Sequence, residues 1–282
     1  MLTIVGAGLG PGSLTPQVRK AVEEANVLII DSYTSPFSSW IIDAVKSLGK
    51  QAMVASRESL EDKSSSIISM ASSFNVAVIV PGDPMVATTH ASLLVEAKLK
   101  GIKVKIIPGI SGPCASMSTS GLQFYRFGRK MTIPGPWRGV GATSTAYWLL
   151  GNMCLDLHTL LLLDVSPDGG QLPPAEGVKA LKDQLDELVG DEWKGFRNLL
   201  VLAISVSDDD VKVSYSSISD PELLAPLTPS TLIVPSRLHP VEREFLETMH
   251  GVPKELLDRH DASLRSVDPC GLFLRSKQKA FE

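Results

Sequence analysis

Residues 76–94 carry the clearest folding signal in the chain, which is a strand, a turn and a helix in direct succession. The apolar, β-branched run Val76–Val80 predicts a buried strand, and two prolines and a glycine at 81–84 predict the turn. The carboxyl end of such a strand is the edge where open α/β folds bind ligands, and Asp83 stands there. The alternative is an ordinary turn in which Asp83 helps to start the following helix.

The first hundred residues repeat this alternation of strand and helix. We expect strands at 2–5, 27–30, 52–55, 76–80 and 102–107, and helices from Thr15–Pro16 and at 37–48, 60–73 and 87–100. The apolar runs are continuous, which is typical of a parallel sheet covered on both faces. The alternation itself is typical of right-handed βαβ units.

Beyond Pro108 the strict alternation ends. We expect helices at 113–120, 174–190 and 240–250, strands at 160–163, 199–204, 211–215 and 232–234, and an irregular stretch at 121–152. The prediction is therefore an α/β chain of two domains, with a mostly parallel sheet in residues 1–110 and a mixed sheet in residues 111–282. The tail from about residue 255 is predicted to be loosely attached.

Composition narrows the class of protein. The 282 residues carry a net charge of −4, which disfavours a phosphate backbone as the main partner. The three cysteines are far apart, so we expect a reducing compartment and no disulfide, and the five histidines show no metal-ligand spacing. No leader and no apolar run of the ~20 residues that span a bilayer is visible, so we expect a soluble cytoplasmic protein without a metal site.

A glycine-rich loop, Gly6–Gly12, follows the first predicted strand and has the outline of a dinucleotide-binding loop. The third glycine of that pattern would fall at Pro11, and the helix begins some residues later, near Thr15. The helix end is then not directed at a pyrophosphate, so a nicotinamide or flavin site is the weaker interpretation.

Four segments taken together identify a family. They are Val5–Gly12 with Leu14–Thr15, Pro81–His90, Gly121–Gly128 and Leu232–Glu242. The first two resemble the tetrapyrrole-methylase superfamily of S-adenosylmethionine (SAM) methyltransferases, which have two α/β domains. The sequences ATTH at 87–90, GLQFYRFG at 121–128, DSYTS at 31–35 and SRE at 56–58 narrow the resemblance to the diphthine synthase family, over residues 1 to about 255.

The resemblance implies a SAM-dependent transferase of the diphthamide pathway. Members methylate the amino group of a 3-amino-3-carboxypropyl arm on a histidine of translation elongation factor 2 and release S-adenosylhomocysteine. Three transfers are implied for the archaeal type, and a further carboxylate methylation for the eukaryotic type. The resemblance also implies a homodimer. From the charge and the lack of a spanning run we expect neither nucleic-acid nor membrane partners.

The family's cofactor site is a cleft between the two domains, and it carries over position by position. The cofactor-binding residues that it implies are Leu9, Asp83, Val86, Gly112, Pro113, Val165, Ser205 and Ser230. The segment Ile110–Cys114 departs from the family pattern by being richer in glycine and proline. No catalytic residue is assignable, because transfer from a sulfonium depends mainly on positioning and on exclusion of water.

Other residues of these motifs have two open interpretations. Tyr33 and Thr34 are candidates for the substrate side, whereas Thr88, Thr89 and His90 either face the cleft or cap a helix. We expect Tyr125 and Arg126 to be packing residues and His239 to fix a turn.

Two alternative functions remain open from the residues alone. One is a methyltransferase of the same fold that acts on a corrinoid precursor or a ribosomal RNA ribose. The other is a SAM-binding module without catalysis.

Overall fold

The computed structural model describes residues 1–36, 39–61, 64–139 and 143–280. This part of the chain forms two compact units. The first comprises Met1–Cys114 with the loops Pro167–Gly170 and Ser207–Asp210, and the second comprises Ala115–Ser166, Gln171–Val206 and Val211–Glu282.

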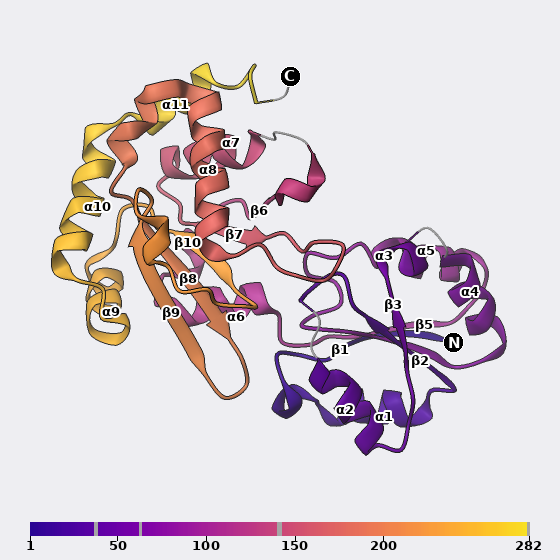
Figure 1. The fold of residues 1–282 in the computed structure, drawn as a ribbon. Helices are drawn as coiled ribbons and strands as arrows, with labels where there is room; N and C mark the ends of the chain where they lie inside the picture. Colours follow the sequence, from indigo (N-terminus) through magenta and orange to yellow (C-terminus); the bar gives the residue numbers. More distant parts are fainter. Residues whose placement is uncertain (37–38, 62–63, 140–142, 281–282) are drawn as a thin grey trace. The chain divides into compact units, whose positions relative to one another are not determined.

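The first unit is built on a parallel sheet that has five strands within the described residues, in the order β3-β2-β4-β1-β5 (Figure 1). Its strands are β1 Leu2–Gly6, β2 Val27–Asp31, β3 Met53–Ala55, β4 Val76–Val80 and β5 Val104–Ile107. Its helices are η1 Pro11–Ser13, α1 Pro16–Glu24, α2 Ser39–Ser47, α3 Arg57–Leu60, α4 Ser64–Ser73 and α5 Ala91–Leu99. The predicted parallel sheet is confirmed.

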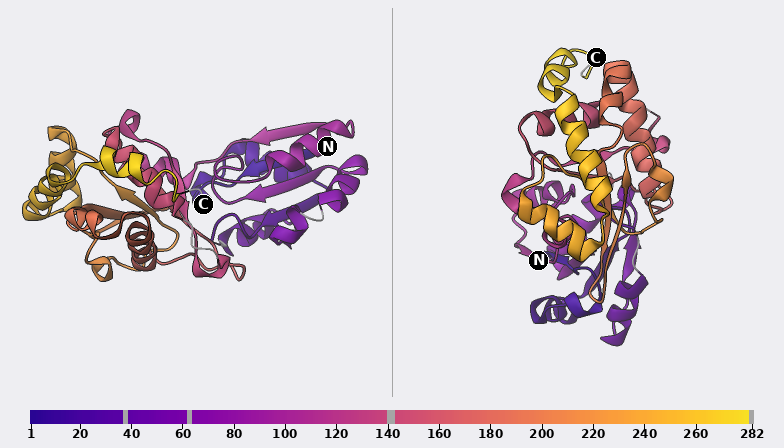
Figure 2. Two further views of the ribbon diagram at one scale, coloured as in Figure 1. Left: turned by 90° about the horizontal axis from the view of Figure 1, so that it is seen from above. Right: turned by 90° about the vertical axis from the view of Figure 1, so that its left-hand side faces the viewer.

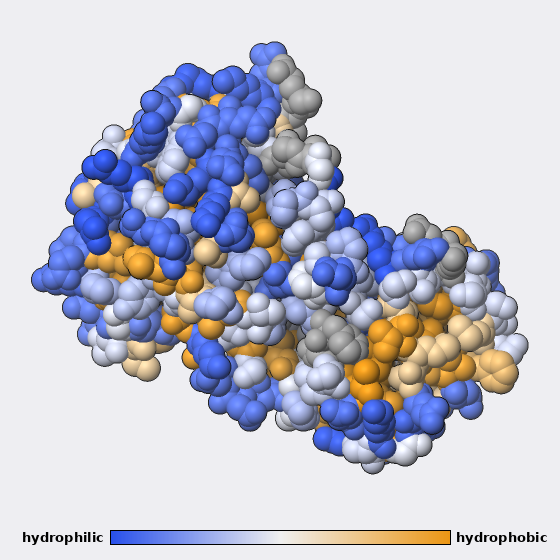
Figure 3. Space-filling model, viewed as in Figure 1, coloured by the Kyte–Doolittle hydropathy of each residue, from blue (hydrophilic) through white to orange (hydrophobic). Residues whose placement is uncertain are grey.

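Both faces of this sheet are covered. Helices α1 and α2 pack on one face through Val18, Val22, Ile41 and Val45, and helices α4 and α5 pack on the other (Figure 1). A strand with apolar side chains on both faces has to be covered twice, which explains its continuous apolar sequence. At the outer edge of the sheet, Met53 and Val54 of β3 stay half exposed, and apolar side chains reach the surface over β2 and β3 (Figure 3).

The predicted helix at 87–100 is too long by one turn. Ala87 has a positive φ of 56°, which a helix cannot accommodate, and α5 begins at Ala91. Residues 87–90 instead belong to the loop before the helix, where the side chain of Thr88 donates to the Pro84 carbonyl oxygen (2.7 Å). The first two residues of the helix predicted at 37–48, and 62–63 within the one predicted at 60–73, lie outside the described residues.

The second unit contains the predicted mixed sheet, with strands in the order β6-β7-β10-β8-β9. The pair β6–β7 is parallel and the remaining pairs are antiparallel. Its strands are β6 Met131–Ile133, β7 Thr159–Leu163, β8 Leu200–Val206, β9 Val211–Ser217 and β10 Thr231–Val234. Its helices, counting α6 which starts in the first unit, are α6 Gly112–Thr119, η2 Phe124–Arg126, η3 Pro136–Arg138, α7 Ser144–Cys154, α8 Pro174–Val189, η4 Gly190–Phe196, η5 Pro221–Leu223, α9 Pro240–His250, α10 Lys254–Ser266 and α11 Pro269–Arg275.

Two expectations for this unit are wrong. The stretch 121–152 contains strand β6 and most of the buried helix α7. The segment from residue 255 is not loosely attached, because it forms α10 and α11 (Figure 2) and buries Leu257 and Leu272 in the unit's cores. Helix α10 has leucine at only three of its 13 positions and α11 has only seven residues, so neither displays a long apolar stripe that would indicate a buried segment.

A disulfide joins Cys154, at the end of α7, to Cys270 in α11, across 116 residues of sequence. The expectation of no disulfide is therefore wrong. The packing of α7 on α11 brings the two cysteines together, and it includes the stacked rings of Tyr147 and Phe273 with centroids 4.5 Å apart. Such a pairing cannot be deduced from cysteine spacing.

Reduction of this disulfide is expected to lower the free energy of unfolding by about 2–4 kcal/mol, because it releases a long loop in the unfolded chain. Thermal unfolding with and without reductant measures the change. As a control, thiol titration of the denatured, unreduced protein should find one thiol, Cys114, instead of the three cysteines of the sequence. Three titratable thiols with an unchanged unfolding temperature would contradict the prediction.

Candidate active site

The first sheet has a topological switch point between β1 and β4. From β1 the chain passes through α1 to β2, and from β4 it passes through α5 to β5 on the other side of the sheet order. The two connections cross opposite faces of the sheet, so the direction of the strand order reverses between β1 and β4. Open α/β sheets bind their ligands at such a point.

The loops after β1, β4 and β5 meet backbone to backbone at this edge. Gly8 and Gly82 form a bridge, with their amide nitrogens 3.1 and 2.9 Å from each other's carbonyl oxygen. A Cβ on Gly6 would lie 2.5 Å from the Gly109 nitrogen, and a Cβ on Gly109 would lie 2.2 Å from the Gly82 oxygen. Glycine is therefore required at Gly6 and Gly109 by close approach of the main chain.

Asp83 holds two of these loops together. One carboxylate oxygen accepts from the amide of Met85 (2.9 Å), and the other accepts from the amide of Gly109 (3.1 Å). Helix α5 starts only at Ala91, so the alternative in which Asp83 caps that helix is wrong. Its carboxylate instead fixes the positions of the loops after β4 and β5.

The meeting of these loops at Gly6, Gly8, Gly82 and Gly109 forms a glycine junction. The other predicted cofactor residues of this unit lie around it. Leu9 follows the Gly8–Gly82 bridge, and its Cδ2 would lie 3.8 Å from a Cβ on Gly112, which is followed by Pro113. Val86 belongs to the loop that Asp83 braces and is partly exposed. The structure thus brings Leu9, Asp83, Val86, Gly112 and Pro113 to one edge of the sheet.

The chemistry of this edge fits the adenosyl and methionine parts of SAM. Met85, Val86 and Ile110 keep apolar side chains exposed on the loops, next to the main-chain groups of the glycine junction. A mainly apolar surface with a few fixed polar groups is typical of cofactor sites.

Asp208, which lies in none of the sequence motifs, fixes the glycine-rich loop. It accepts hydrogen bonds from the amides of Gly12 (2.5 Å) and Ser13 (3.0 Å) and from the Ser13 hydroxyl. Because it lies 196 residues from Gly12 in the sequence, no local pattern could have found it.

A second group of family motifs meets at the ends of β2 and β4. Asp31 is fully buried and accepts from the amides of Tyr33 (2.8 Å) and Thr34 (3.2 Å) and from the Thr34 hydroxyl (2.6 Å). His90 is also buried, and its Nε2 lies 3.1 Å from Asp31 Oδ2, although these atoms are not aligned as a hydrogen bond. His90 Nδ1 faces the Pro84 oxygen at 3.1 Å and therefore carries a proton.

Next to this buried pair, Tyr33, Thr89 and Glu61 form a partly exposed cluster. The Tyr33 hydroxyl lies 3.1 Å from Glu61 Oε1 and 2.9 Å from Thr89 Oγ1, which donates to the same Glu61 oxygen at 2.6 Å. Neither Thr89 nor His90 therefore makes a side-chain cap on α5. Glu61 was missed in the sequence, although it stands three residues after the SRE motif.

The predicted cofactor residues of the second unit, Val165, Ser205 and Ser230, lie at one edge of its sheet. Val165 follows β7, Ser205 is near the end of β8, and Ser230 precedes β10, which runs antiparallel to both strands. Gln171 connects two of them, since it forms a bridge with Val165 and its side-chain amide makes two hydrogen bonds to the Ser230 main chain (2.8 and 2.9 Å).

The two remaining family motifs build a buried ionic network in the second unit. Glu242 is 1% exposed; it accepts from Arg126 (2.7 Å) and from His158 Nε2 (3.0 Å). The expectation that Arg126 is a packing residue agrees with this network, whereas Tyr125 is 95% exposed and does not pack. His239 fixes a turn as expected, because its side chain caps α9 in a reciprocal arrangement with Glu242.

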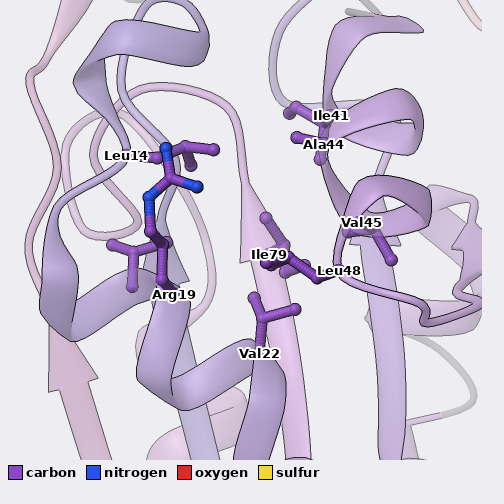
Figure 4. A pocket seen from close by; sticks show the side chains of 9 residues that line it. Leu14, Arg19, Val22, Ile41, Ala44, Val45, Leu48 and Ile79 are labelled. Atoms are coloured by element: carbon purple, nitrogen blue, oxygen red, sulfur yellow. The ribbon is translucent and has the colours of Figure 1, made fainter.

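An apolar pocket lies elsewhere in the first unit, between α1 and α2. Its lining consists of aliphatic side chains and one arginine (Figure 4), and none of these is a predicted site residue: Leu14, Val18, Arg19, Val22, Ile41, Ala44, Val45, Leu48 and Ile79.

Among the described residues, no set of three His, Cys, Asp or Glu side chains is placed to bind a metal ion. In the same part of the chain, no helix has the length and hydropathy to cross a bilayer.

Comparison of sequences identifies relatives along most of the chain. A model of the tetrapyrrole (corrin/porphyrin) methylases matches residues 1–190. A diphthine synthase of Pyrobaculum aerophilum is 34% identical over 252 residues, which cover 88% of this chain and 96% of that protein. A diphthine synthase of Aeropyrum pernix is 47% identical over 182 residues, which cover 64% of this chain and 62% of that protein.

Solved structures agree with the sequence comparison. A crystal structure of a conserved hypothetical protein from Aeropyrum pernix K1 has a TM-score of 0.80 at 34% identity and covers 97% of this chain and 98% of that chain. A crystal structure of a diphthine synthase has a TM-score of 0.79 at 30% identity and covers 91% and 98%. The chain therefore belongs to the tetrapyrrole methylase family and, within it, to the diphthine synthases, which are SAM-dependent methyltransferases.

Proposed function

We propose that this protein binds SAM and methylates the amino group of the 3-amino-3-carboxypropyl-histidine of translation elongation factor 2. The observation that carries the proposal is the junction of the β1, β4 and β5 loops, where Leu9, Asp83 and Gly112 converge at the switch point of the sheet. The full-length similarity to diphthine synthases supports the choice of substrate.

Methyl transfer requires little covalent chemistry from the protein's own side chains. SAM supplies, when bound, an activated methyl group on a sulfonium that becomes a neutral thioether. The residues around the junction hold the donor, and the exposed side chains of Met85, Val86 and Ile110 shield the reacting atoms from water. Asp83 acts through the loops, because both of its oxygens are engaged by main-chain amides.

The proposed donor site also includes Val165, Ser205 and Ser230 of the second unit. Their main-chain and hydroxyl groups would complete the polar contacts to the cofactor, as the family resemblance implies. Substituting Gln171, which holds the Ser230 main chain, would then weaken SAM binding without touching the first unit.

We further propose that the protein is a cytoplasmic homodimer. Elongation factor 2 works in the cytoplasm, and the family resemblance implies the dimer. Light scattering of the purified protein during gel filtration gives its mass in solution and tests the dimer directly.

The proposed function is tested by incubating the pure protein with methyl-labelled SAM and elongation factor 2 that carries the unmethylated aminocarboxypropyl-histidine. The intact mass of the factor should rise in steps of one methyl group, and the number of steps identifies the product. An unchanged mass despite SAM binding would contradict the proposal. The hypotheses to test would then be methylation of a corrinoid precursor, methylation of ribosomal RNA and SAM binding without catalysis.

A further inference from the structure

The cluster of Tyr33, Glu61 and Thr89 has more acceptors than donors. Its three oxygens lie within 2.6–3.1 Å of one another, so they form a triangle of three possible hydrogen bonds. Each hydroxyl carries one hydrogen and the ionised carboxylate carries none, so two hydrogens serve three contacts. One of the three contacts therefore has no hydrogen between its two oxygens, so the cluster can accept a hydrogen bond from an external donor.

The remaining oxygen of Glu61 does not fill this deficit. Glu61 Oε2 accepts from Arg57 Nε at 2.7 Å, so this oxygen already has a partner of its own. The Glu61 side chain is 22% exposed and Thr89 is exposed, so the triangle is open to an incoming group. The buried pair of Asp31 and His90 adjoins the cluster through the edge contact of the His90 and Tyr33 rings, whose centroids are 6.3 Å apart.

The charge states favour a cationic donor. Burial acts to raise the pKa of Glu61, but hydrogen bonds from Thr89, Arg57 and Tyr33 outweigh it and lower that pKa, so Glu61 is an anion at neutral pH. Burial, with a contribution from the Asp31 and Glu61 charges, raises the pKa of Tyr33 to about 12. The Tyr33 hydroxyl therefore stays neutral and can accept a hydrogen bond.

We propose that Glu61, Tyr33 and Thr89 bind the ammonium group of the methyl acceptor. This inference rests on the proposed function and adds the acceptor site to it. Glu61 Oε1 attracts the cation, the two hydroxyls accept its N–H groups, and the Tyr33 ring lies beside a methylated ammonium. The cluster follows β2 and precedes α5, at the carboxyl edge that carries the donor junction.

The same geometry distinguishes intermediates from the final product. Before each transfer the bound ammonium group loses one proton to solvent, and the lone pair of the resulting amine forms a bond to the methyl carbon while the carbon–sulfur bond breaks and S-adenosylhomocysteine leaves. Each cycle therefore replaces an N–H donor by a methyl group, so the hydroxyl acceptors lose partners one at a time. A trimethylammonium group keeps only its charge and its contact with the ring. The cluster therefore holds partly methylated intermediates more tightly than the finished product.

The test compares the wild type with Glu61→Gln, Tyr33→Phe and the control Glu24→Gln, which alters an exposed carboxylate on α1. We expect Glu61→Gln to raise the KM for the aminocarboxypropyl-modified elongation factor about tenfold, as for a lost hydrogen bond to a charged group, and Tyr33→Phe to raise it less. Both variants should release under-methylated factor, visible by intact mass. SAM affinity by calorimetry and the unfolding temperature should match the control.

Two results would overturn the inference while the proposed function stands. One is a wild type that methylates the factor and variants with the same KM and the same fully methylated product. The other is an equal loss of SAM affinity and thermal stability, which would make the cluster a structural tie between loops. A wild type that does not methylate the factor would overturn the proposed function, and this inference with it.

Discussion

An Asp83→Ala variant is expected to lose about 100-fold in kcat/KM, because two hydrogen bonds to a charged group disappear from the donor site at once. The Asp83 carboxylate holds the amides of Met85 and Gly109, which belong to the loops after β4 and β5. Without it the glycine junction loses the link that sets its shape. Calorimetric titration should show the same loss in SAM affinity.

Asp83→Asn and Asp43→Ala are the matched controls. Asparagine keeps one oxygen to accept an amide, so its loss should be smaller than that of alanine. Asp43 is an exposed acid on α2, and its replacement should leave kcat/KM unchanged. Wild-type affinity for SAM in Asp83→Ala would show that the carboxylate has no part in the donor site.

A Glu242→Ala variant is expected to be less stable by about 3–5 kcal/mol, since it leaves buried charged and polar partners unpaired. The Glu242 carboxylate accepts from Arg126 and His158 and from the amides of Gln123 (2.8 Å) and His239 (2.7 Å). Denaturant unfolding measures the difference. Glu24→Ala is the control, because an exposed helix pair with Lys20 contributes about 0.5 kcal/mol or less.

The same network predicts how stability depends on pH. Burial alone would raise the pKa of Glu242, but hydrogen bonds from His158, Gln123 and His239 lower it to about 2. A carboxyl group whose folded pKa is lowered stabilises the protein above its unfolded pKa of about 4.3, and this contribution of about 3 kcal/mol is lost as pH falls toward 2. The stability difference between wild type and Glu242→Gln should therefore shrink between about pH 5 and pH 2. A difference that stays constant over this range would contradict the assignment.

The sequence was sufficient for the first unit's architecture. Continuous apolar runs such as Val76–Val80 are buried on both faces in the structure, and the change of pattern after Pro108 corresponds to a mixed sheet. These features depend on local composition and on hydrophobic periodicity, which a sequence displays directly. The start of α5 at Ala91 could not be predicted, because it depends on the positive φ of Ala87. An alanine gives no local signal for that conformation.

The motifs also identified the family, but their roles needed the structure. Two of the four segments, 121–128 and 232–242, meet through Arg126 and Glu242 and serve the core of the second unit. The other two converge at the glycine junction, where the predicted residues Leu9, Asp83 and Gly112 lie close together. From the sequence alone, the structural motifs and the site motifs look the same.

The sequence by itself determined the α/β class, the change to a mixed sheet and the family, because each follows from local patterns or from combinations of short motifs. Only the tertiary structure decided that Glu61 joins Tyr33 and Thr89, that Asp208 holds Gly12, and that Cys154 pairs with Cys270. These contacts join residues from 28 to 196 positions apart. Such pairings are set by how whole elements pack on one another, and a specific contact between two distant residues leaves no periodic pattern in the sequence.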